Sequence, residues 1–268
     1  MPPKNMPKYK TLTVDVREGI ATVTFNRPEI ANALDDDMAA DLLTLFPALS
    51  NDPKVRVVVV TGAGKNFCAG GNIAVFREML DNGQTLTYEN LIKGGQIPIL
   101  MKKCRKPIIA MVNGAAIGAG TAFALGADFR VMSPKSRFGM GFIGLGLPGD
   151  TGANYALAKL VGPSKALELM MLGDVIKGDK CYELGIATYL SGADNLEEVT
   201  YALAKRLAAG PTYAYACQKE VMYKYFYGDY TAYIEGEADT MPSAFASKDL
   251  DEAVNAFLEK RAPVFRGE

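Results

Sequence analysis

Apolar and polar residues alternate along the first segment of the chain and give way to longer apolar runs further on. Residues 11–25, TLTVDVREGIATVTF, alternate on both sides of Glu18-Gly19, which predicts a β-hairpin with its turn at that pair. The near-continuous apolar run at residues 55–61, which contains Arg56, and the apolar run at residues 107–112 are typical of strands that are buried on both faces. Shorter strands are expected at residues 129–133, 136–139 and 185–190.

Helices are expected wherever apolar residues recur at helical spacing. The segments with this spacing are residues 35–50, 85–104, 154–160, 163–171, 179–184, 196–208, 211–222 and 250–260, and one further helix begins soon after Asn72. Strands and helices alternate early and helices dominate late, which predicts an α/β fold class with a helical C-terminal region. We therefore expect a flexible lead-in over residues 1–10, an α/β core over residues 11–195 and a helical region over residues 196–268. A dense cluster of tyrosines between residues 213 and 233 favours a helix-packing or subunit-contact face.

Small residues follow each of the two long apolar runs, at the point where a helix is expected to begin. Residues 115–120, AAIGAG, lead into an apolar helix that ends near Asp128, and residues 67–73, FCAGGNI, lead into an earlier helix. A helix start made of Gly and Ala leaves backbone N–H groups without a side chain to cover them. Such groups suit an anion or a carbonyl oxygen that gains charge. Two such turns favour an oxyanion hole built from two loops, with close helix packing as the alternative explanation.

The composition limits the chemistry that these two turns could serve. The 268 residues include no histidine, which excludes Ser-His-Asp and Cys-His catalysis and most zinc sites. The four cysteines form no Cys-x-x-Cys pair, so we expect no metal site and no disulfide framework, as in a reducing cytoplasm. A net charge of −1 does not predict a basic surface for nucleic acid or an anionic membrane. No apolar run approaches the roughly 20 residues of a membrane span. The N-terminal segment does not resemble a secretory signal. Any acid–base step must then use a carboxylate, Lys, Tyr or Cys.

Several short motifs together make the chain resemble the crotonase superfamily, also called the enoyl-CoA hydratase/isomerase family. The resemblance covers about residues 12–267, and it rests on the order and spacing of the motifs. The motifs are Asn26-Arg27-Pro28 with Asn32-Ala33-Leu34, residues 67–73, residues 107–128, residues 138–152, Leu160-Val161-Gly162 and residues 256–261 (AFLEKR). The resemblance implies a core made of a spiral of ββα turns. It also implies a helical C-terminal trimerisation region, and hence a homotrimer or a dimer of trimers.

The resemblance further implies a substrate and the residues that bind it. The substrate would be an acyl-CoA thioester, with coenzyme A as part of the substrate and no separate cofactor. Its carbonyl oxygen would accept hydrogen bonds from the backbone N–H groups of Gly71 and Ala119, which favour an enolate because the enolate oxygen carries more charge. Arg27 falls near the CoA phosphates, and Phe257 and Lys260 fall near the adenine end of CoA, from the same subunit or its neighbour. The remaining substrate-binding positions are Ala31, Ala69, Ile73 and Phe142.

The departures from the family pattern decide which reaction to expect. The two glutamates that hold a water in the family's hydratases fall on Ala122 and Phe142, so a two-glutamate hydratase mechanism is not expected. A third acidic position, used in the family's dienoyl-CoA isomerases and phenylacetate-pathway isomerases, falls on Asp150 in a Pro-Gly-Asp turn. The surrounding apolar segment would raise the pKa of this carboxyl and suit it to proton transfer. The alternative role is structural, since Asp before Thr-Gly is a frequent helix N-cap.

We therefore expect an acyl-CoA isomerase in which Asp150 removes a proton from one carbon of the acyl chain and returns it to another. Gly71 and Ala119 would hold the enolate oxygen between the two steps. Hydration or C–C bond hydrolysis, with Asp150 activating a water, is the first alternative. The second is a non-catalytic family member that only binds a CoA ester or a partner protein.

Overall fold

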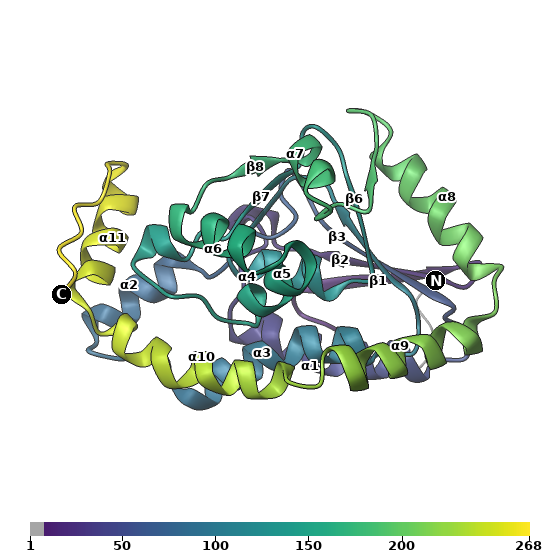
Figure 1. Ribbon diagram of the computed structural model, residues 1–268, viewed down its shortest axis with the longest axis horizontal. Helices are drawn as coiled ribbons and strands as arrows, with labels where there is room; N and C mark the ends of the chain where they lie inside the picture. Colours follow the sequence, from purple (N-terminus) through teal and green to yellow (C-terminus); the bar gives the residue numbers. More distant parts are fainter. Residues whose placement is uncertain (1–7) are drawn as a thin grey trace.

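Strands and helices alternate along the computed structural model, which describes residues 8–268 (Figure 1). The expected lead-in over residues 1–10 lies mostly outside the described residues. The strands are β1 (Leu12–Arg17), β2 (Ile20–Phe25), β3 (Val57–Gly62), β4 (Ile108–Val112), β5 (Ala115–Ile117), β6 (Phe129–Met132), β7 (Arg137–Gly139), β8 (Ile176–Lys177) and β9 (Tyr189–Leu190). The helices are α1 (Asp36–Asn51), α2 (Ile73–Asp81), α3 (Tyr88–Lys103), α4 (Ala119–Gly126), α5 (Ala153–Val161), α6 (Pro163–Leu172), α7 (Gly178–Glu183), α8 (Leu196–Ala208), α9 (Thr212–Phe226), α10 (Tyr230–Phe245) and α11 (Lys248–Glu259), with short 3-10 turns η1 (Pro28–Ile30) and η2 (Ile143–Leu145).

The large sheet contains six strands in the order β1-β2-β3-β4-β6-β9. Strands β1 and β2 form the expected antiparallel hairpin, in which Leu12 lies opposite Phe25. Glu18 and Gly19 take φ values of 51° and 79°, as a type I′ turn requires. Every other neighbouring pair in this sheet is parallel. The two long apolar runs form β3 and β4, and both strands are buried throughout, as the sequence predicts.

The chain moves back and forth between this sheet and a smaller one made of β5, β7 and β8. Strand β4 is followed by β5 and then α4, and β6 is followed by β7 and, after η2, by α5. Two isolated bridges extend the same arrangement to earlier turns, because Cys68 pairs with Ala116 and Leu34 pairs with Gly71. Each turn thus adds a long strand, a short extended segment and a helix, which confirms the expected spiral. The sequence pattern missed one detail, since residues 115–117, which lead into the helix that begins at Ala119, form the short strand β5.

Helices cover both faces of the large sheet. Helix α8 packs on one face, where Leu203 and Ala204 meet Val57 and Val131, and the larger core lies on the other face. In Figure 1, α9 and α10 run along the lower edge beside α1 and α3, while α11 stands at the end of the molecule next to α2. The sequence patterns missed α10, whose segment contains Gly236 and Pro242, two residues that disfavour a helix interior.

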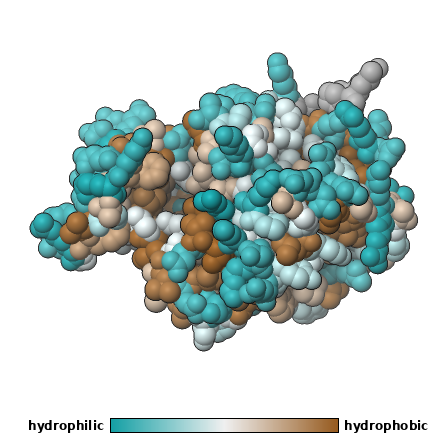
Figure 2. Space-filling view, turned by 90° about the horizontal axis from the view of Figure 1, so that it is seen from above, coloured by the Kyte–Doolittle hydropathy of each residue, from teal (hydrophilic) through white to brown (hydrophobic). Residues whose placement is uncertain are grey.

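Apolar patches break the hydrophilic surface that is seen from above in Figure 2. Exposed apolar side chains are numerous on α6 and in the loop that follows it, where they include Leu167, Met171, Leu172 and Val175. Contiguous exposed apolar surface often marks a contact with another protein. Self-association as a homotrimer or a dimer of trimers stays a prediction. Within residues 8–268, no helix is both long enough and apolar enough to cross a membrane.

Candidate active site

The first candidate N–H donor lies where β5 turns into α4. The turn residue is Gly118, whose φ of 51° and ψ of −122° strongly favour glycine. Helix α4 begins with Ala119, and the first N–H groups of a helix have no partner inside it. The carbonyl of Gly118 already accepts from the backbone N–H and the hydroxyl of Thr121, at 2.9 and 2.6 Å. These two bonds fix the turn and do not use the Ala119 N–H, which is left without an acceptor in the described chain.

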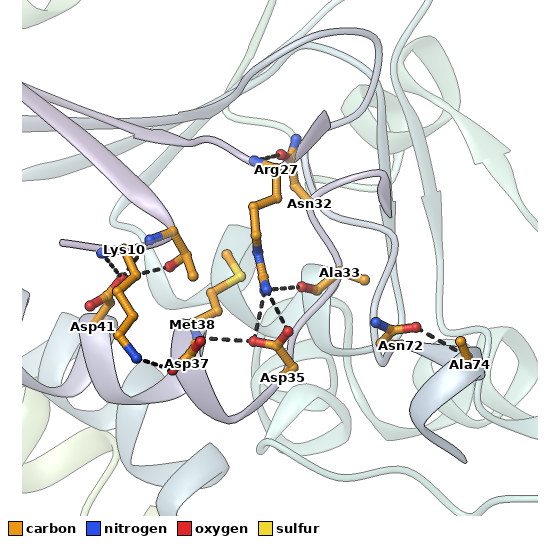
Figure 3. Close-up of polar contacts among 11 residues, drawn as sticks. Lys10, Arg27, Asn32, Ala33, Asp35, Asp37, Met38, Asp41, Asn72 and Ala74 are labelled. Atoms are coloured by element: carbon orange, nitrogen blue, oxygen red, sulfur yellow. Dashed lines mark hydrogen bonds and ion pairs between the residues drawn. The ribbon is translucent and has the colours of Figure 1, made fainter. Parts of the chain in front are cut away.

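The second candidate donor lies in the loop between β3 and α2. The Leu34 N–H donates to the carbonyl of Gly70 at 2.7 Å, and the Asn72 N–H donates to the carbonyl of Leu34 at 3.3 Å. Neither bond uses the N–H of Gly71, which lies between Gly70 and Asn72 in the sequence. Asn72 then starts α2 as its N-cap, where its side-chain oxygen accepts from the Ala74 N–H at 3.1 Å (Figure 3). The loop is thus fixed on both sides of Gly71.

The two loops meet through close backbone contacts that only glycine permits. A Cβ atom on Gly70 would lie 2.8 Å from the carbonyl oxygen of Ile117 and 3.6 Å from the nitrogen of Ala119. A Cβ atom on Gly120 would lie 2.1 Å from the carbonyl oxygen of Cys68. Among residues 8–268, neither the Gly71 nor the Ala119 N–H donates a hydrogen bond. The loops that carry the two expected donors are therefore in contact and both N–H groups are free, as an oxyanion hole would require, and that role stays a prediction.

Asp150 lies in the turn that precedes α5, and α5 packs against α4. Its Oδ1 atom is buried and, within the described part of the chain, accepts no hydrogen bond. Burial raises the pKa of the Asp150 carboxyl to about 6, although a hydrogen bond from the Thr151 side chain acts in the opposite direction. The residue that caps α5 is Gly152, and no side chain makes a capping hydrogen bond there. The helix-cap alternative for Asp150 is therefore wrong.

The backbone around Asp150 is unusual. Gly149, Thr151 and Gly152 have φ values of 111°, 55° and 68°. A positive φ is rare for a β-branched residue such as Thr151 and costs about 1–3 kcal/mol, so the surroundings must hold it in place. Buried strain of this kind is found most often at functional sites.

The two positions that hold glutamates in the family's hydratases are apolar and buried in this protein. Ala122 lies inside α4 and is fully buried, and Phe142 is 8% exposed. The Phe142 ring covers the turn before α4, since a Cβ atom on Gly118 would lie 3.6 Å from it. The resemblance points to three positions that are acidic in family members. Of these, only Asp150 carries a carboxyl in this protein.

Sequence reasoning missed one buried carboxyl near this turn. Glu237 on α10 is 8% exposed, and its Oε2 accepts a hydrogen bond from the Gly152 N–H at 2.8 Å. Its Oε1 is buried and makes no hydrogen bond to any residue of the described chain. The signal that could have found it is a lone acidic residue on an apolar helix face whose spacing is set by Ile234, Ala238 and Met241.

Arg27 lies close to the Gly71 loop but does not present a free charge. Figure 3 shows its guanidinium directed at Asp35, with the Nη2 atom 2.8 Å from Oδ1 and 3.0 Å from the carbonyl oxygen of Ala33. Burial alone would raise the pKa of Asp35, but the hydrogen bonds from Arg27 and from the Met38 N–H outweigh it and hold this pKa below its ordinary value. Arg27 therefore stabilises residues 31–35. Within this segment, Leu34 makes the two hydrogen bonds to the loop that contains Gly71.

Replacing Arg27 with Met should destabilise the fold by about 1.5–3 kcal/mol, because it leaves the partly buried Asp35 carboxylate without its partner. The pKa of Asp35 is lowered in the folded state, so this stabilisation is present above the ordinary pKa and is lost as pH falls through the lowered one. Urea unfolding should therefore separate Arg27→Met from wild type at neutral pH and much less in acid. The matched control is Arg17→Met, which breaks an exposed pair with Asp15 and should cost less than about 1 kcal/mol. Equal losses in the two variants would contradict this role of Arg27.

The other expected substrate-binding residues lie in two places. The Ala69 N–H donates to the carbonyl of Ala31 at 3.1 Å, and Ile73 opens α2, so these three residues surround the Gly71 donor. Phe257 and Lys260 lie apart from them, at the end of α11, where Phe257 is 60% exposed and Lys260 is exposed in a left-handed cap. Helix α11 packs against α2 and η2 of the same chain. Their contact with CoA stays a prediction.

No group of three or more Cys, Asp or Glu side chains in the described chain could hold a metal ion. The cysteine nearest the donors, Cys68, is fully buried, and burial raises the pKa of its thiol to about 12. A thiol in this state is a poor nucleophile. Cys68 is therefore not expected to act as a nucleophile.

The chain is similar to known proteins over nearly its whole length. A family model described as enoyl-CoA hydratase/isomerase matches residues 15–268. The chain is 32% identical over 254 residues to 1,2-epoxyphenylacetyl-CoA isomerase of Escherichia coli, covering 94% of this chain and 97% of that protein. It is 31% identical to crotonyl-CoA hydratase of Syntrophomonas wolfei, covering 96% and 98%, and 28% identical to trans-2-decenoyl-[acyl-carrier-protein] isomerase of Streptococcus mutans, covering 97% and 99%.

Solved structures give the same result. A crystal structure of an enoyl-CoA hydratase from Mycobacterium avium subsp. paratuberculosis superposes with a TM-score of 0.87 at 26% identity, over 97% of this chain and all of the other. One of a putative enoyl-CoA hydratase from Streptomyces coelicolor superposes with a TM-score of 0.77 at 34% identity, over all of this chain and 98% of the other. These matches span nearly the whole chain and agree with the spiral fold. The chain belongs to the enoyl-CoA hydratase/isomerase family, the crotonase superfamily.

Proposed function

We propose that this protein is an acyl-CoA isomerase that stabilises a thioester enolate and moves one proton with Asp150. The thioester oxygen accepts from the N–H groups of Gly71 and Ala119. Asp150 takes a proton from one carbon of the acyl chain and returns it at another, which shifts a double bond or rearranges a strained ring. One carboxyl is enough, because the enolate holds the negative charge between the two transfers.

The observation that carries this proposal is the Asp150 carboxyl, whose Oδ1 atom is buried and makes no hydrogen bond within the described residues, and whose pKa is raised to about 6. A base with this pKa is largely ionised at neutral pH and yet gives its proton back readily. The apolar residues Ala122 and Phe142 support isomerisation over hydration, since no second carboxyl is present at either position to hold a water. Two of the relatives are named as isomerases of thioesters, one of CoA and one of acyl-carrier protein.

Hydration is the second candidate, because another relative of similar identity is named as a crotonyl-CoA hydratase. In that reaction Asp150 would activate a water for addition to the double bond. A C–C hydrolase would use the same carboxyl and the same water.

Labelled water separates these reactions. The protein is incubated with trans-2-decenoyl-CoA in deuterated water and, separately, in water labelled with heavy oxygen, and the thioesters are analysed by mass spectrometry. Isomerisation predicts deuterium on the α- or γ-carbon and no labelled oxygen. Labelled oxygen in the product would replace the isomerase assignment with a hydratase or hydrolase. Tight CoA-ester binding without any exchange, across a panel of chain lengths and ring systems, would favour a binding protein.

A further inference from the structure

A buried carboxyl on the C-terminal helix α10 is connected to the turn that carries Asp150. Glu237 lies on the same helix face as Tyr230, Ile234 and Met241, all of which are buried, and it is the one acidic side chain among them. Burying a carboxyl is expensive unless its oxygens are hydrogen bonded. Here only one oxygen is satisfied within residues 8–268, which is the Oε2 atom that accepts from Gly152.

Helix α10 makes hydrogen bonds to both backbone polar groups of Gly152, its N–H and its carbonyl. Glu237 accepts from its N–H at 2.8 Å, and the Tyr230 hydroxyl donates to its carbonyl at 3.1 Å. The fit is close, because a Cβ atom on Gly152 would lie 2.4 Å from the Tyr230 ring. Gly152 comes two residues after Asp150, and Thr151 between them has a positive φ. The two contacts from α10 therefore act directly on the strained segment that sets the direction of the Asp150 side chain.

We propose that Glu237 is a positioning residue for Asp150, which holds the strained turn before α5 from the buried face of α10 and places the two carboxyls in one site. This inference rests on the proposed function of Asp150 as the proton carrier. It assigns to the helical C-terminal region a role in the chemistry of the core. Through the Gly152 peptide, a displacement of α10 would move the base that faces the substrate.

The titration of the two carboxyls is consistent with this connection. Burial raises the pKa of Glu237 to about 8, the Gly152 N–H opposes this, and the charge of Asp150 adds to it. The titratable groups that face Glu237 are Asp150 from the turn and Tyr230 and Tyr233 from α10. Near neutral pH, Asp150 is then ionised while Glu237 keeps its proton. When Glu237 loses that proton at higher pH, its negative charge increases the proton affinity of Asp150.

Two substitutions test the role of Glu237. Glu237→Gln keeps an acceptor for the Gly152 N–H and the shape of the protonated acid, whereas Glu237→Leu removes the acceptor. With trans-2-decenoyl-CoA in deuterated water, we expect Glu237→Leu to lower the exchange kcat about 100-fold with little change in KM, because a small misplacement of a catalytic group has an effect of this size. Glu237→Gln should restore kcat to within about threefold at neutral pH and should remove a step near pH 8 from the wild-type pH profile of kcat/KM.

The control is Met241→Leu, which changes a fully buried side chain on the same helix face without touching Gly152. It should leave kcat within about threefold of wild type, as volume-conserving core changes usually do. A Glu237→Leu variant with wild-type kcat, or a step near pH 8 that persists in Glu237→Gln, would overturn the proposal. The pH profile decides the matter even if Glu237→Leu fails to fold, because the Gln variant alone provides it.

A double variant separates this proposal from the proposed function. If Glu237 acts through Asp150, then Glu237→Leu should not slow the residual reaction of Asp150→Asn any further, since effects within one unit are not additive. Losses that multiply would mean that Glu237 acts independently of Asp150. An Asp150→Asn variant with normal exchange would instead refute the function of Asp150 itself, whatever Glu237 does.

Discussion

Asp150→Asn should lower kcat for deuterium exchange about 1,000-fold and leave KM for the thioester nearly unchanged. The amide keeps the size of the side chain but has no basic oxygen, and a positioned base contributes about 10²–10⁴-fold to a rate. In the wild-type protein, kcat/KM should rise with pH through about 6 as the carboxyl ionises. Steady-state kinetics with trans-2-decenoyl-CoA over this range measure both effects. The matched control is Asp174→Asn, an exposed residue after α6, which should behave as wild type.

The same variant makes an independent prediction about stability. The pKa of Asp150 is raised in the folded state, so its contribution to stability is fully present below its ordinary pKa of 3.8 and is lost as pH rises through about 6. Asp150→Asn avoids this loss, and above pH 6 it should be more stable than wild type by about 2–3 kcal/mol. Urea unfolding across this pH range provides the measurement. A variant that is less active and less stable at every pH would mean that Asp150 is mainly structural.

Gly70→Ala should lower kcat/KM by about 10²–10³-fold because it forces the two donor loops apart. Its Cβ atom would lie 2.8 Å from the Ile117 carbonyl oxygen and next to the Ala119 nitrogen. Moving either loop would misdirect an oxyanion-hole donor, and the loss of one donor typically costs a factor of this size. The φ of 92° at Gly70 adds strain for any other residue. Steady-state kinetics measure the loss, and near-ultraviolet circular dichroism and thermal unfolding show whether the fold is retained.

Gly83→Ala is the control that separates backbone strain from displacement of the donors. Gly83 also has a positive φ, 62°, but no atom lies within 4 Å of the Cβ that the substitution would add. It should reproduce the strain, a cost of about 1–3 kcal/mol in stability, without loss of kcat. If Gly70→Ala retained wild-type kcat/KM, the proposed pair of N–H donors would be refuted. If both variants lost activity equally, the effect would come from strain alone.

The sequence by itself determined the local elements and the class of chemistry. Alternation predicted the hairpin at Glu18-Gly19, because a strand buried on one face alternates apolar and polar residues. Apolar runs predicted β3 and β4, because a strand buried on both faces is apolar along its length. The absence of histidine, with Ala122 and Phe142 at the hydratase positions, left a carboxyl as the expected base. The elements depend only on the identity and order of the residues, and the expected base depends also on the resemblance to the family.

Only the tertiary structure decided which of these elements meet. The loops that carry Gly71 and Ala119 lie together because Cys68 pairs with Ala116 across two turns of the spiral, and periodicity carries no information about that pairing. The structure removed the helix-cap alternative for Asp150, because no side chain caps α5 and the Oδ1 atom of Asp150 is buried, and its role as a base stays a prediction. Glu237 is the clearest case, since its bond to Gly152 joins residues 85 apart. A sequence pattern predicts which face of a helix is buried, but the surface that face contacts depends on the packing of the whole chain.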